Sequence, residues 1–466
     1  MSKIYDFILV GSGPGGMISG FLLSEKGYKV CLVEKGNNPN KKDFKNFNSF
    51  KNYYDKVLPV ISQNIFGFGQ ASCLGGGSVI NGALIWGLPM HTQGKWKDEF
   101  GEIFVNKINE NYLKIRDYLN VKNSQILNFS ESTNIDSKLI KDASEKLKWN
   151  IVSVPRALEK CDELNNCGFG CNNKNSVEKI FLNKFIKNKG DVFTDSEVKN
   201  FSLEKSSVKY LQLKNGKKIL GKKFILSAGS INSNLILQTS KITKKSFIQF
   251  HLNLKIVAFH KRKIYSEKGT MFTHQVQEFM KDGYVFMSTN YTKDSFLSSL
   301  LHLKPDERKK CYELYDNGGI YVTQVQPKAI GKIYQFKGNY LVKYFLSNED
   351  KNLIKKSVKN LVKLLFEAGF ESIVLPSKNT NEIIRKNDWN PELVDNIDSW
   401  EMLSVHSMAA NRMGTDKRNS VVNVQGKVHG IDNLYITDSS SLPSSVGESP
   451  QGVIMSNAKR IIDLIN

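Results

Sequence analysis

Three glycines near the start of the chain, Gly11, Gly13 and Gly16, stand at the spacing G-x-G-x-x-G. An apolar run at residues 5–10 precedes them and a helical pattern at residues 17–26 follows, so the turn joins a buried strand to a helix. In that setting glycine permits a tight turn and lets the backbone approach a pyrophosphate, while the helix N-terminus offers its unpaired N–H groups to the phosphates. The turn therefore predicts a dinucleotide-binding site.

A carboxylate stands where such a site needs one. Glu34 ends a second expected strand at residues 29–34, 18 residues after Gly16. A carboxylate at that point accepts hydrogen bonds from two ribose hydroxyls and repels a 2′-phosphate. The motif alone does not separate FAD from NAD, and a strand–turn–helix without any ligand is the alternative.

Three cysteines, Cys161, Cys167 and Cys171, occur together at the spacing C-x5-C-x3-C. Thiolates on a short irregular loop suit a metal ion or an iron–sulfur cluster, because thiolate is a soft ligand. The alternative is a packed loop without metal, or one disulfide with a spare thiol. The spacing alone leaves both open.

The surrounding pattern predicts the elements that must position these residues. The strand–helix–strand order at the start begins a parallel α/β sheet. Residues 36–70 are polar and predict a long surface excursion. Alternating runs between about 241 and 346 predict an antiparallel sheet with one wet face, and residues 349–368 predict a helix with one apolar face. A strand at residues 433–437 and a terminal helix from about 450 close the chain.

Length and charge limit the class of protein. A chain of 466 residues favours two domains over one core. The net charge of +21 invites a nucleic-acid interpretation, but the charge is spread thinly and its densest points, 261–263 and 308–310, lie in no basic tract with interleaved aromatics. We therefore expect no nucleic-acid partner; weak attraction to anionic membranes, polyanions or an acidic redox partner is the alternative. No transmembrane segment and no signal peptide are recognised, so the expected location is the cytoplasm.

Three further segments resemble one enzyme family. Residues 74–82, Leu-Gly-Gly-Gly-Ser-Val-Ile-Asn-Gly, resemble the G-G-x-S-x-x-N-G loop of the glucose–methanol–choline (GMC) oxidoreductases, which lies along the flavin. Residues 223–231 resemble the family's strand that ends in A-G-(A/S)-I, and residues 406–454 resemble its C-terminal signature. The segments occur in the family's order and spacing, from residue 4 to the last helix.

The resemblance implies an α/β fold, α+β overall, with a Rossmann-like FAD-binding domain and an inserted substrate domain built on an antiparallel sheet. The implied FAD-binding domain comprises residues 1–85, 150–240 and 400–466, and the substrate domain comprises residues 86–149 and 241–399. Residues implied to bind FAD, besides Gly11, Gly13, Gly16 and Glu34, are Gly76, Ser78, Asn81, Val198, Ala228, Gly229 and Asp438. Val198 also fits a plain strand core.

The resemblance also implies the chemistry. Oxidation of an alcohol or sugar hydroxyl needs the hydroxyl proton removed while a hydride leaves carbon for flavin N5, and a neutral imidazole suits that proton transfer. His406 occupies the family's active-site histidine position, so we assign it as the base. Where the family has a second His or Asn, this chain has Ser449; its hydroxyl is shorter but still donates, and Gln451 is a second source of an amide.

Two alternatives follow from these residues. Ser449 keeps open a flavin-bound lyase, isomerase or decarboxylase on the same fold. The cysteine loop resembles that of FAD glucose dehydrogenase catalytic subunits and of long-chain alcohol oxidases, with Leu164 at the place of the latter's extra cysteine. A three-iron cluster there would pass electrons to an external acceptor, such as a partner subunit, and make the protein a dehydrogenase instead of an oxidase. No motif specifies the substrate.

Overall fold

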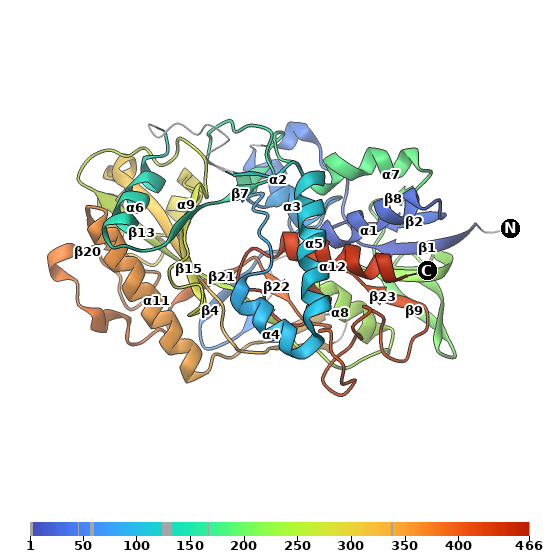
Figure 1. Cartoon of the computed structure of the whole chain (residues 1–466). Helices are drawn as coiled ribbons and strands as arrows, with labels where there is room; N and C mark the ends of the chain where they lie inside the picture. Colours follow the sequence, from blue (N-terminus) through green and yellow to red (C-terminus); the bar gives the residue numbers. More distant parts are fainter. Residues whose placement is uncertain are drawn as a thin grey trace.

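The structure, a computed structural model, describes residues 3–44, 46–55, 60–123, 133–165, 167–336 and 339–465. Figure 1 shows two lobes, each built on its own sheet, with both ends of the chain in the same lobe. Residues 45, 56–59 and 166, which fall in the expected excursion and in the cysteine loop, lie outside the described residues.

The lobe that holds both chain ends is built on a parallel sheet. Its strands run in the order β8-β2-β1-β11, and β23 pairs in parallel with the carboxyl half of β11. These strands span Ile4–Val10 (β1), Val30–Val33 (β2), Asp191–Phe193 (β8), Lys218–Leu226 (β11) and Leu434–Ile436 (β23). An antiparallel hairpin, β9 (Val198–Glu204) and β10 (Ser207–Leu213), extends the amino half of β11. The apolar runs of β1 and β2 are buried because helices cover a parallel sheet.

Helices close this first sheet. They are α1 (Pro14–Glu25), α5 (Glu102–Tyr118), α8 (Ser230–Thr239) and α12 (Gln451–Leu464). The C-terminal helix α12 packs between α1 and α5, so the end of the chain is held against its first helix (Figure 1). This arrangement confirms the Rossmann-like α/β part of the expected fold.

The second lobe is built on a larger sheet. Its strands run in the order β20-β19-β13-β16-β15-β14-β6, and the pairs on this path are antiparallel. The strands span Ile151–Ser153 (β6), Leu252–His260 (β13), His274–Val276 (β14), Tyr284–Ser288 (β15), Gly318–Val325 (β16), Phe370–Val374 (β19) and Ile384–Arg385 (β20). Helix α11 (Asn348–Glu367) packs on this sheet through the apolar face that its sequence pattern predicts. The predicted antiparallel sheet is thus confirmed.

Part of the expected surface excursion belongs to this second lobe. Strand β4 (Ile65–Phe68) pairs in parallel with β21 (Glu401–Ser404), and β21 also pairs with β13. Strand β3 (Val60–Ile61) pairs with β18 (Asn339–Lys343), which forms a separate small sheet with β17 (Lys332–Phe336). The prediction of a surface excursion was therefore wrong for residues 60–68, because two short apolar runs within the polar stretch form strands.

The remaining helices and strands are short or peripheral. They are α2 (Phe47–Phe50), α3 (Gly77–Ile80), α4 (Met90–Phe100), α6 (Ile135–Lys146), α7 (Asn183–Lys187), α9 (Lys293–Ser298), α10 (Pro305–Glu313), β5 (Lys122–Asn123), β7 (Pro155–Arg156), β12 (Gln249–Phe250) and β22 (Ser407–Met408). The division of the chain into domains stays a prediction; β4, β6 and β21, from ranges assigned to the FAD-binding domain, pair within the second sheet.

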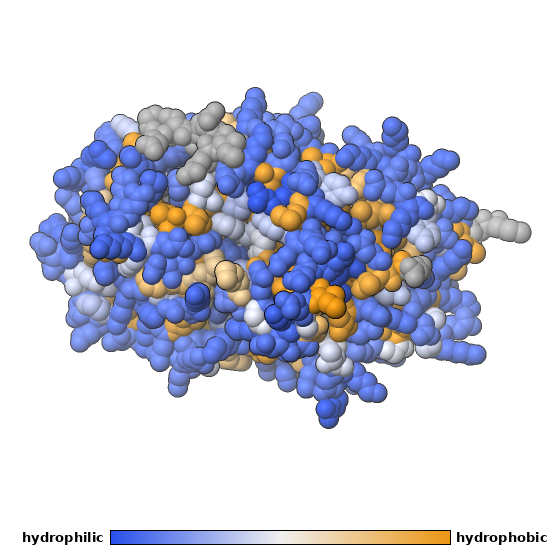
Figure 2. Space-filling view, in the orientation of Figure 1, coloured by the Kyte–Doolittle hydropathy of each residue, from blue (hydrophilic) through white to orange (hydrophobic). Residues whose placement is uncertain are grey.

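The helices and the surface were compared with what a membrane-bound protein would need. Among the helices of the described residues, none has the length and apolar character to cross a bilayer. Figure 2 shows a mostly hydrophilic face with small, separate hydrophobic groups. Scattered exposed apolar side chains of this kind are ordinary for folded domains.

Candidate active site

A cavity of about 1220 Å³ lies between the two sheets. The residues that follow the carboxyl ends of β1, β2, β11 and β23 line one side of it, which is where open α/β sheets bind ligands. Side chains of β13, β15 and β16 line the other side. Nearly all of the site residues expected from the sequence line this cavity; Gly16, Ser78 and the three cysteines do not.

The glycine turn has the shape of a phosphate cradle. Gly11 has φ +94°, and a Cβ there would come within 2.3 Å of the Ser227 carbonyl oxygen. A Cβ on Gly16 would lie 2.0 Å from the Gly11 oxygen, so this glycine serves the packing of helix against turn. At Gly13, by contrast, a Cβ would meet no atom within 4 Å. The open space beside Gly13, at the N-terminus of α1, fits the pyrophosphate of a dinucleotide.

Glu34 lies at the end of β2 with both carboxylate oxygens engaged. Its Oε2 accepts hydrogen bonds from the Ser12 amide (2.9 Å) and hydroxyl (2.6 Å), and its Oε1 accepts from the Gly36 amide (2.8 Å). Burial raises the pKa of this carboxyl, although the three donors oppose the rise. The carboxylate is therefore fixed in place before any ligand arrives, with lone pairs left for ribose hydroxyls.

The flavin-type loop lies against the glycine turn. Gly76 has φ +54°, and a Cβ there would come within 2.7 Å of the Gly13 Cα. Ser78 supports the loop from behind: its hydroxyl donates to the Gly75 oxygen at 2.8 Å and accepts from the Val177 amide at 3.1 Å. The loop then delivers Asn81 to the cavity, where its Nδ2 donates to Gln451 Oε1 at 2.5 Å.

Asp438 follows β23 and ties the mid-chain turn to the C-terminal segment. Its Oδ2 accepts from the Gly229 amide (2.9 Å) and the Ser233 hydroxyl (2.5 Å), and its Oδ1 accepts from the amide (2.9 Å) and hydroxyl of Ser440 (2.5 Å). Burial raises its pKa while these donors act in the opposite direction. Ala228 lines the cavity beside this cluster. Val198, at the start of β9, is buried in the strand and also lines the cavity, so both of its expected roles are compatible with its position.

His406 forms a pair with a second histidine that the sequence did not single out. His406 Nδ1 lies 3.2 Å from His251 Nδ1, and the Gly447 amide donates to His251 Nε2 at 3.0 Å. Because His251 Nε2 accepts, the neutral His251 carries its proton on Nδ1 and donates it to His406 Nδ1. The neutral His406 then holds its own proton on Nε2, the nitrogen without a partner among the described residues.

Burial keeps both rings of this pair neutral. It lowers the pKa of His406 to about 4, and it lowers the pKa of His251 well below the ordinary value, with a further contribution from the neighbouring His406 and His91. Between pH 5 and 8 His406 is therefore uncharged, as a proton acceptor must be.

Ser449 and Gln451 enter the cavity from the start of α12. No hydrogen bond involves the Ser449 hydroxyl among the described residues, so it is free to contact a substrate oxygen. The neighbouring Glu448 is buried, its pKa is raised to about 8 by that burial, and it accepts a hydrogen bond from Gln275 at 3.2 Å. Glu448 is thus largely protonated at neutral pH and supports the turn.

The cysteine loop packs under the flavin-type loop without forming a metal centre in the described part of the chain. No group of three His, Cys, Asp or Glu side chains among these residues could hold a metal ion. The Arg156 guanidinium donates to Cys167 Sγ at 3.6 Å, and the buried Lys174 ammonium donates to the carbonyl oxygens of Asn81 (2.7 Å) and Cys167 (3.1 Å). Cys161, Cys167 and Cys171 are free thiols. Their arrangement does not fit a three-thiolate cluster, and the loop instead supports the backbone around Asn81.

Comparisons with known proteins agree with this geometry. Family models described as GMC oxidoreductase match residues 5–257 and 339–458. Long-chain-alcohol oxidase FAO3 of Arabidopsis thaliana is 22% identical over 97% of this chain and 66% of its own length. The uncharacterized GMC-type oxidoreductase y4nJ of Sinorhizobium fredii is 22% identical over 98% of this chain and 94% of its own.

A solved structure has the same fold. The crystal structure of pyridoxine 4-oxidase from Mesorbium loti superposes with a TM-score of 0.73 at 13% sequence identity and covers 98% of both chains. This chain spans slightly less than two thirds of the plant oxidase, 66%, and nearly all of y4nJ, 94%.

Proposed function

This chain belongs to the GMC oxidoreductase family, whose members are FAD-dependent oxidoreductases acting on CH–OH donors, and on that premise we propose that it oxidises the hydroxyl of a small-molecule alcohol. The observation that carries the proposal is the shared cavity: the phosphate cradle at Gly13 and the neutral imidazole of His406 line the same space. A dinucleotide held at Gly13 would therefore share one cavity with His406.

The residues that would hold FAD come from several parts of the chain. The N-terminus of α1 and Gly13 would take the pyrophosphate, Glu34 the ribose, and Asp438 with the Gly229 turn the segment between pyrophosphate and flavin. When bound, FAD supplies the acceptor for the hydride that leaves the substrate carbon. The protein's own side chains would carry out proton transfer and substrate orientation.

His406 would remove the hydroxyl proton while the hydride leaves the substrate carbon for FAD. Nε2 has to be bare to accept that proton, so the reactive tautomer of His406 carries its own proton on Nδ1, unlike the resting tautomer that the hydrogen bond from His251 favours. The imidazolium formed on His406 would release its proton to water after the oxidised product has left. His251 would position the His406 ring and take no proton, because its Nε2 faces the Gly447 amide donor.

Ser449 and Gln451 would orient the substrate oxygen. The free Ser449 hydroxyl can donate to it, and the Nε2 of Gln451 is available because Asn81 binds only the Oε1. Asn81 thus fixes which end of the Gln451 amide meets the substrate. No cluster relay is part of the proposal, since the cysteine loop of the described chain does not form a metal site.

The test is the visible spectrum of the purified protein before and after anaerobic addition of alcohols. We expect oxidised-flavin bands, and bleaching by a subset of primary and secondary alcohols. The His406→Ala variant should bind FAD but be reduced at least about 100-fold more slowly, because general base catalysis contributes roughly 10²–10⁴-fold. A protein that stays colourless after reconstitution with FAD would contradict the proposal, and unchanged reduction of the variant would contradict the role of His406.

A further inference from the structure

The wall of the cavity that faces the first sheet comes from the second sheet. Along β13, buried Leu252, Leu254 and Ile256 face the α11 side, so the alternating positions Asn253 and Lys255 face the cavity.

The strand register puts further side chains on the same wall. Asn253 lies opposite Gln324 of β16, and Lys255 lies opposite Val322. All four line the cavity, so they form one continuous surface. We call Lys255, Asn253 and Gln324 the donor triad.

The Lys255 ammonium has no counterion. Among the described residues, no hydrogen bond or ion pair reaches it, and burial alone lowers its pKa. The acidic residues that line the cavity do not come from the second sheet; they are Glu34, Asp55, Glu197 and Asp438. Holding an ammonium in a half-buried place without an anion costs free energy, which a bound anion would recover.

The two amides of the triad lack partners as well. Gln324 is only 5% exposed, and its Nε2 has no hydrogen-bond partner. A buried amide donor left unpaired in a protein interior calls for an acceptor, and here that acceptor would have to enter the cavity. Asn253, half-buried beside it, makes no side-chain hydrogen bond within the described residues. The triad therefore offers one positive charge and neutral N–H donors to a single acceptor group.

Apolar side chains predominate around the triad. Leu84, Phe272, Met287, Val322 and Leu403 line the cavity there, and Thr289 and Asn290, which follow β15, add polar groups. An occupant of this space thus has an apolar body and one anionic end. A single ammonium with amide donors matches a carboxylate, whereas a phosphate dianion is usually met by more positive charge.

We propose that the substrate is an alcohol that carries a carboxylate, and that Lys255, with Gln324 and Asn253, binds the carboxylate. The inference rests on the proposed function and names its substrate class. His251, whose ring meets His406, lies four residues before Lys255 on an extended chain, so their Cα atoms are about 13 Å apart. Lys255 consequently holds the substrate at the end away from the reacting hydroxyl and acts as a specificity-determining residue.

Calorimetry with compounds that cannot be oxidised tests the binding directly. The flavin-loaded protein is titrated with 4-methylbenzoate and with hexanoate, each against its uncharged amide. We expect each carboxylate to bind at least about tenfold more tightly than its amide, because the hydrogen bond from the Lys255 ammonium to a carboxylate is charge-assisted. Lys255→Met should abolish this preference and Lys255→Arg should keep most of it.

A matched control removes a charge elsewhere. Lys309→Met, on the exposed face of α10, changes the net charge by the same amount and should keep the preference. Equal binding of carboxylate and amide by the unaltered protein, or a preference that survives in Lys255→Met, would overturn the proposal. Tighter binding of 4-methylphenyl phosphate than of 4-methylbenzoate would also overturn it, in favour of a phosphate substrate.

A second measurement separates this inference from the oxidation itself. Anaerobic flavin reduction is followed with 4-(hydroxymethyl)benzoate and 4-(hydroxymethyl)benzamide. Lys255→Met should raise the half-saturating concentration of the acid about 10- to 100-fold and change the limiting rate by less than about threefold. If reduction fails with every alcohol while the carboxylate preference persists, the oxidation proposal falls and the Lys255 site stands. If the amide is reduced as efficiently as the acid, the Lys255 proposal falls instead.

Discussion

Gly13 and Gly16 belong to the same turn but differ in what surrounds them. A Cβ at Gly13 meets no atom within 4 Å, and the backbone there has φ −60°, which alanine adopts easily. We therefore predict that Gly13→Ala changes the free energy of unfolding of the flavin-free protein by no more than about 1 kcal/mol. Binding of FAD should nevertheless weaken at least 100-fold, because the methyl group enters the space of the pyrophosphate. Fluorescence titration of FAD and thermal melting measure the two effects.

Gly16→Ala is the matched control for that experiment. Its Cβ would lie 2.0 Å from the Gly11 oxygen, so it should destabilise the flavin-free protein by about 1–3 kcal/mol. If Gly13→Ala bound FAD with unchanged affinity, the pyrophosphate could not lie against this turn.

The histidine pair gives a prediction for His251. Without His251, the His406 ring loses the contact at Nδ1 that holds it in place in the cavity. We expect His251→Phe to slow flavin reduction at least about tenfold, corresponding to about 1.4 kcal/mol. The control is His91→Gln, a second partly buried histidine that bonds Gln326 instead of His406; its rate should stay within about threefold. Equal rates for His251→Phe and the unaltered protein would contradict a positioning role of His251.

The same pair fixes the sign of the pH dependence. Lowering the pKa of His406 to about 4 keeps the base form populated above that value, and protonation removes it as the pH falls through about 4. The rate of flavin reduction should therefore be flat from pH 6 to 8 and decline only toward pH 4. An inflection near pH 6.5, the ordinary histidine value, would show that His406 is solvated in the working enzyme. Stopped-flow reduction in buffers of constant ionic strength measures the profile.

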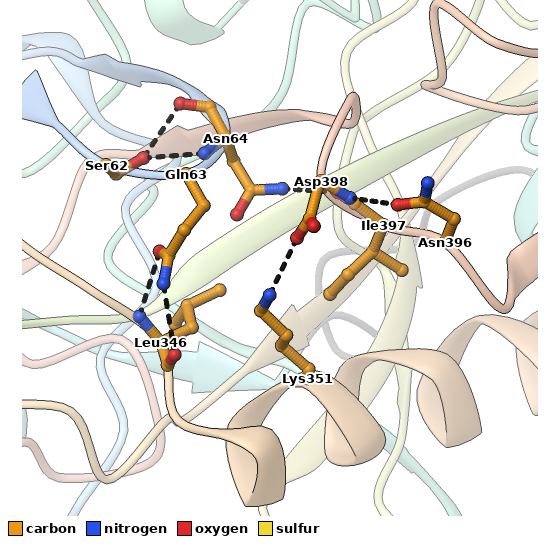
Figure 3. Close-up of polar contacts among 8 residues, drawn as sticks. All are labelled: Ser62, Gln63, Asn64, Leu346, Lys351, Asn396, Ile397 and Asp398. Carbon is orange, nitrogen blue, oxygen red and sulfur yellow. Dashed lines mark hydrogen bonds and ion pairs between the residues drawn. The ribbon is translucent and has the colours of Figure 1, made fainter.

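At the scale of elements, the segment 62–64 shows how a polar stretch is built into the fold. Figure 3 shows Gln63 and Asn64 reaching in different directions from the start of β4. Gln63 exchanges two hydrogen bonds with the backbone of Leu346 (3.2 and 3.3 Å), and Asn64 Nδ2 donates to the Ile397 oxygen. Lys351 on α11 in turn binds Asp398 at 2.7 Å. The contacts of Gln63 and Asn64 attach the segment before β4 to the backbone at Leu346 and Ile397.

Asn64 and Gln63 differ in burial, so their hydrogen bonds should contribute differently to the free energy of unfolding. Asn64 is 8% exposed, whereas Gln63 lies at the surface, where water replaces lost bonds. We predict that Asn64→Ala lowers the free energy of unfolding by about 0.5–1.5 kcal/mol, because it removes a buried hydrogen bond to the Ile397 oxygen, which keeps the Trp400 amide as its other donor. Gln63→Ala should cost less than about 1 kcal/mol although it removes two bonds. Urea unfolding of both variants makes the comparison; a larger loss for Gln63→Ala would mean that burial does not set these energies.

The sequence predicted the elements whose periodicity is long and regular. The strand at residues 5–10, the alternating runs of β13, β15 and β16, and the helix at 349–368 lie where the pattern put them. Strands β3 and β4 were missed because they are short apolar runs inside a polar stretch, and because their partners are more than 250 residues away in the chain. The wet face expected of the antiparallel sheet turned out to face the cavity: β15 and β16 are buried on both sides.

The site was predictable where a residue belongs to a local motif and unpredictable where it does not. Gly13, Glu34 and Asp438 follow the ends of strands, so the strand pattern beside each residue predicts its place in the site. His251 and Lys255 sit at ordinary positions of a strand pattern, and only the fold brings the first to His406 and turns the second into the cavity. A lysine at an alternating position of a strand predicts a solvated side chain. Only the structure shows that this face of the strand lines a cavity.

At the scale of the whole molecule, the net charge of +21 favours the approach of anionic ligands. A strongly basic protein attracts anionic ligands from a distance, and the unpaired Lys255 ammonium lies at the wall of the cavity that would receive them. Residues of both sheets line one cavity. Under the proposed function, the first sheet would hold the cofactor and the second sheet the substrate carboxylate, so neither lobe alone would form a complete active site.

Because residues from both lobes line one cavity, FAD should stabilise the molecule as a whole. A ligand that binds only the folded state adds about 2.7 kcal/mol at a free concentration 100-fold above its Kd. For a chain of 466 residues that corresponds to a rise in Tm of roughly 3 °C, so removing FAD should lower the melting temperature by this amount and adding it back should restore it. Circular dichroism follows both lobes at once, and Gly13→Ala should show no response to added FAD. A melting temperature that is the same with and without FAD would mean that the cofactor does not bind across the cavity between the lobes.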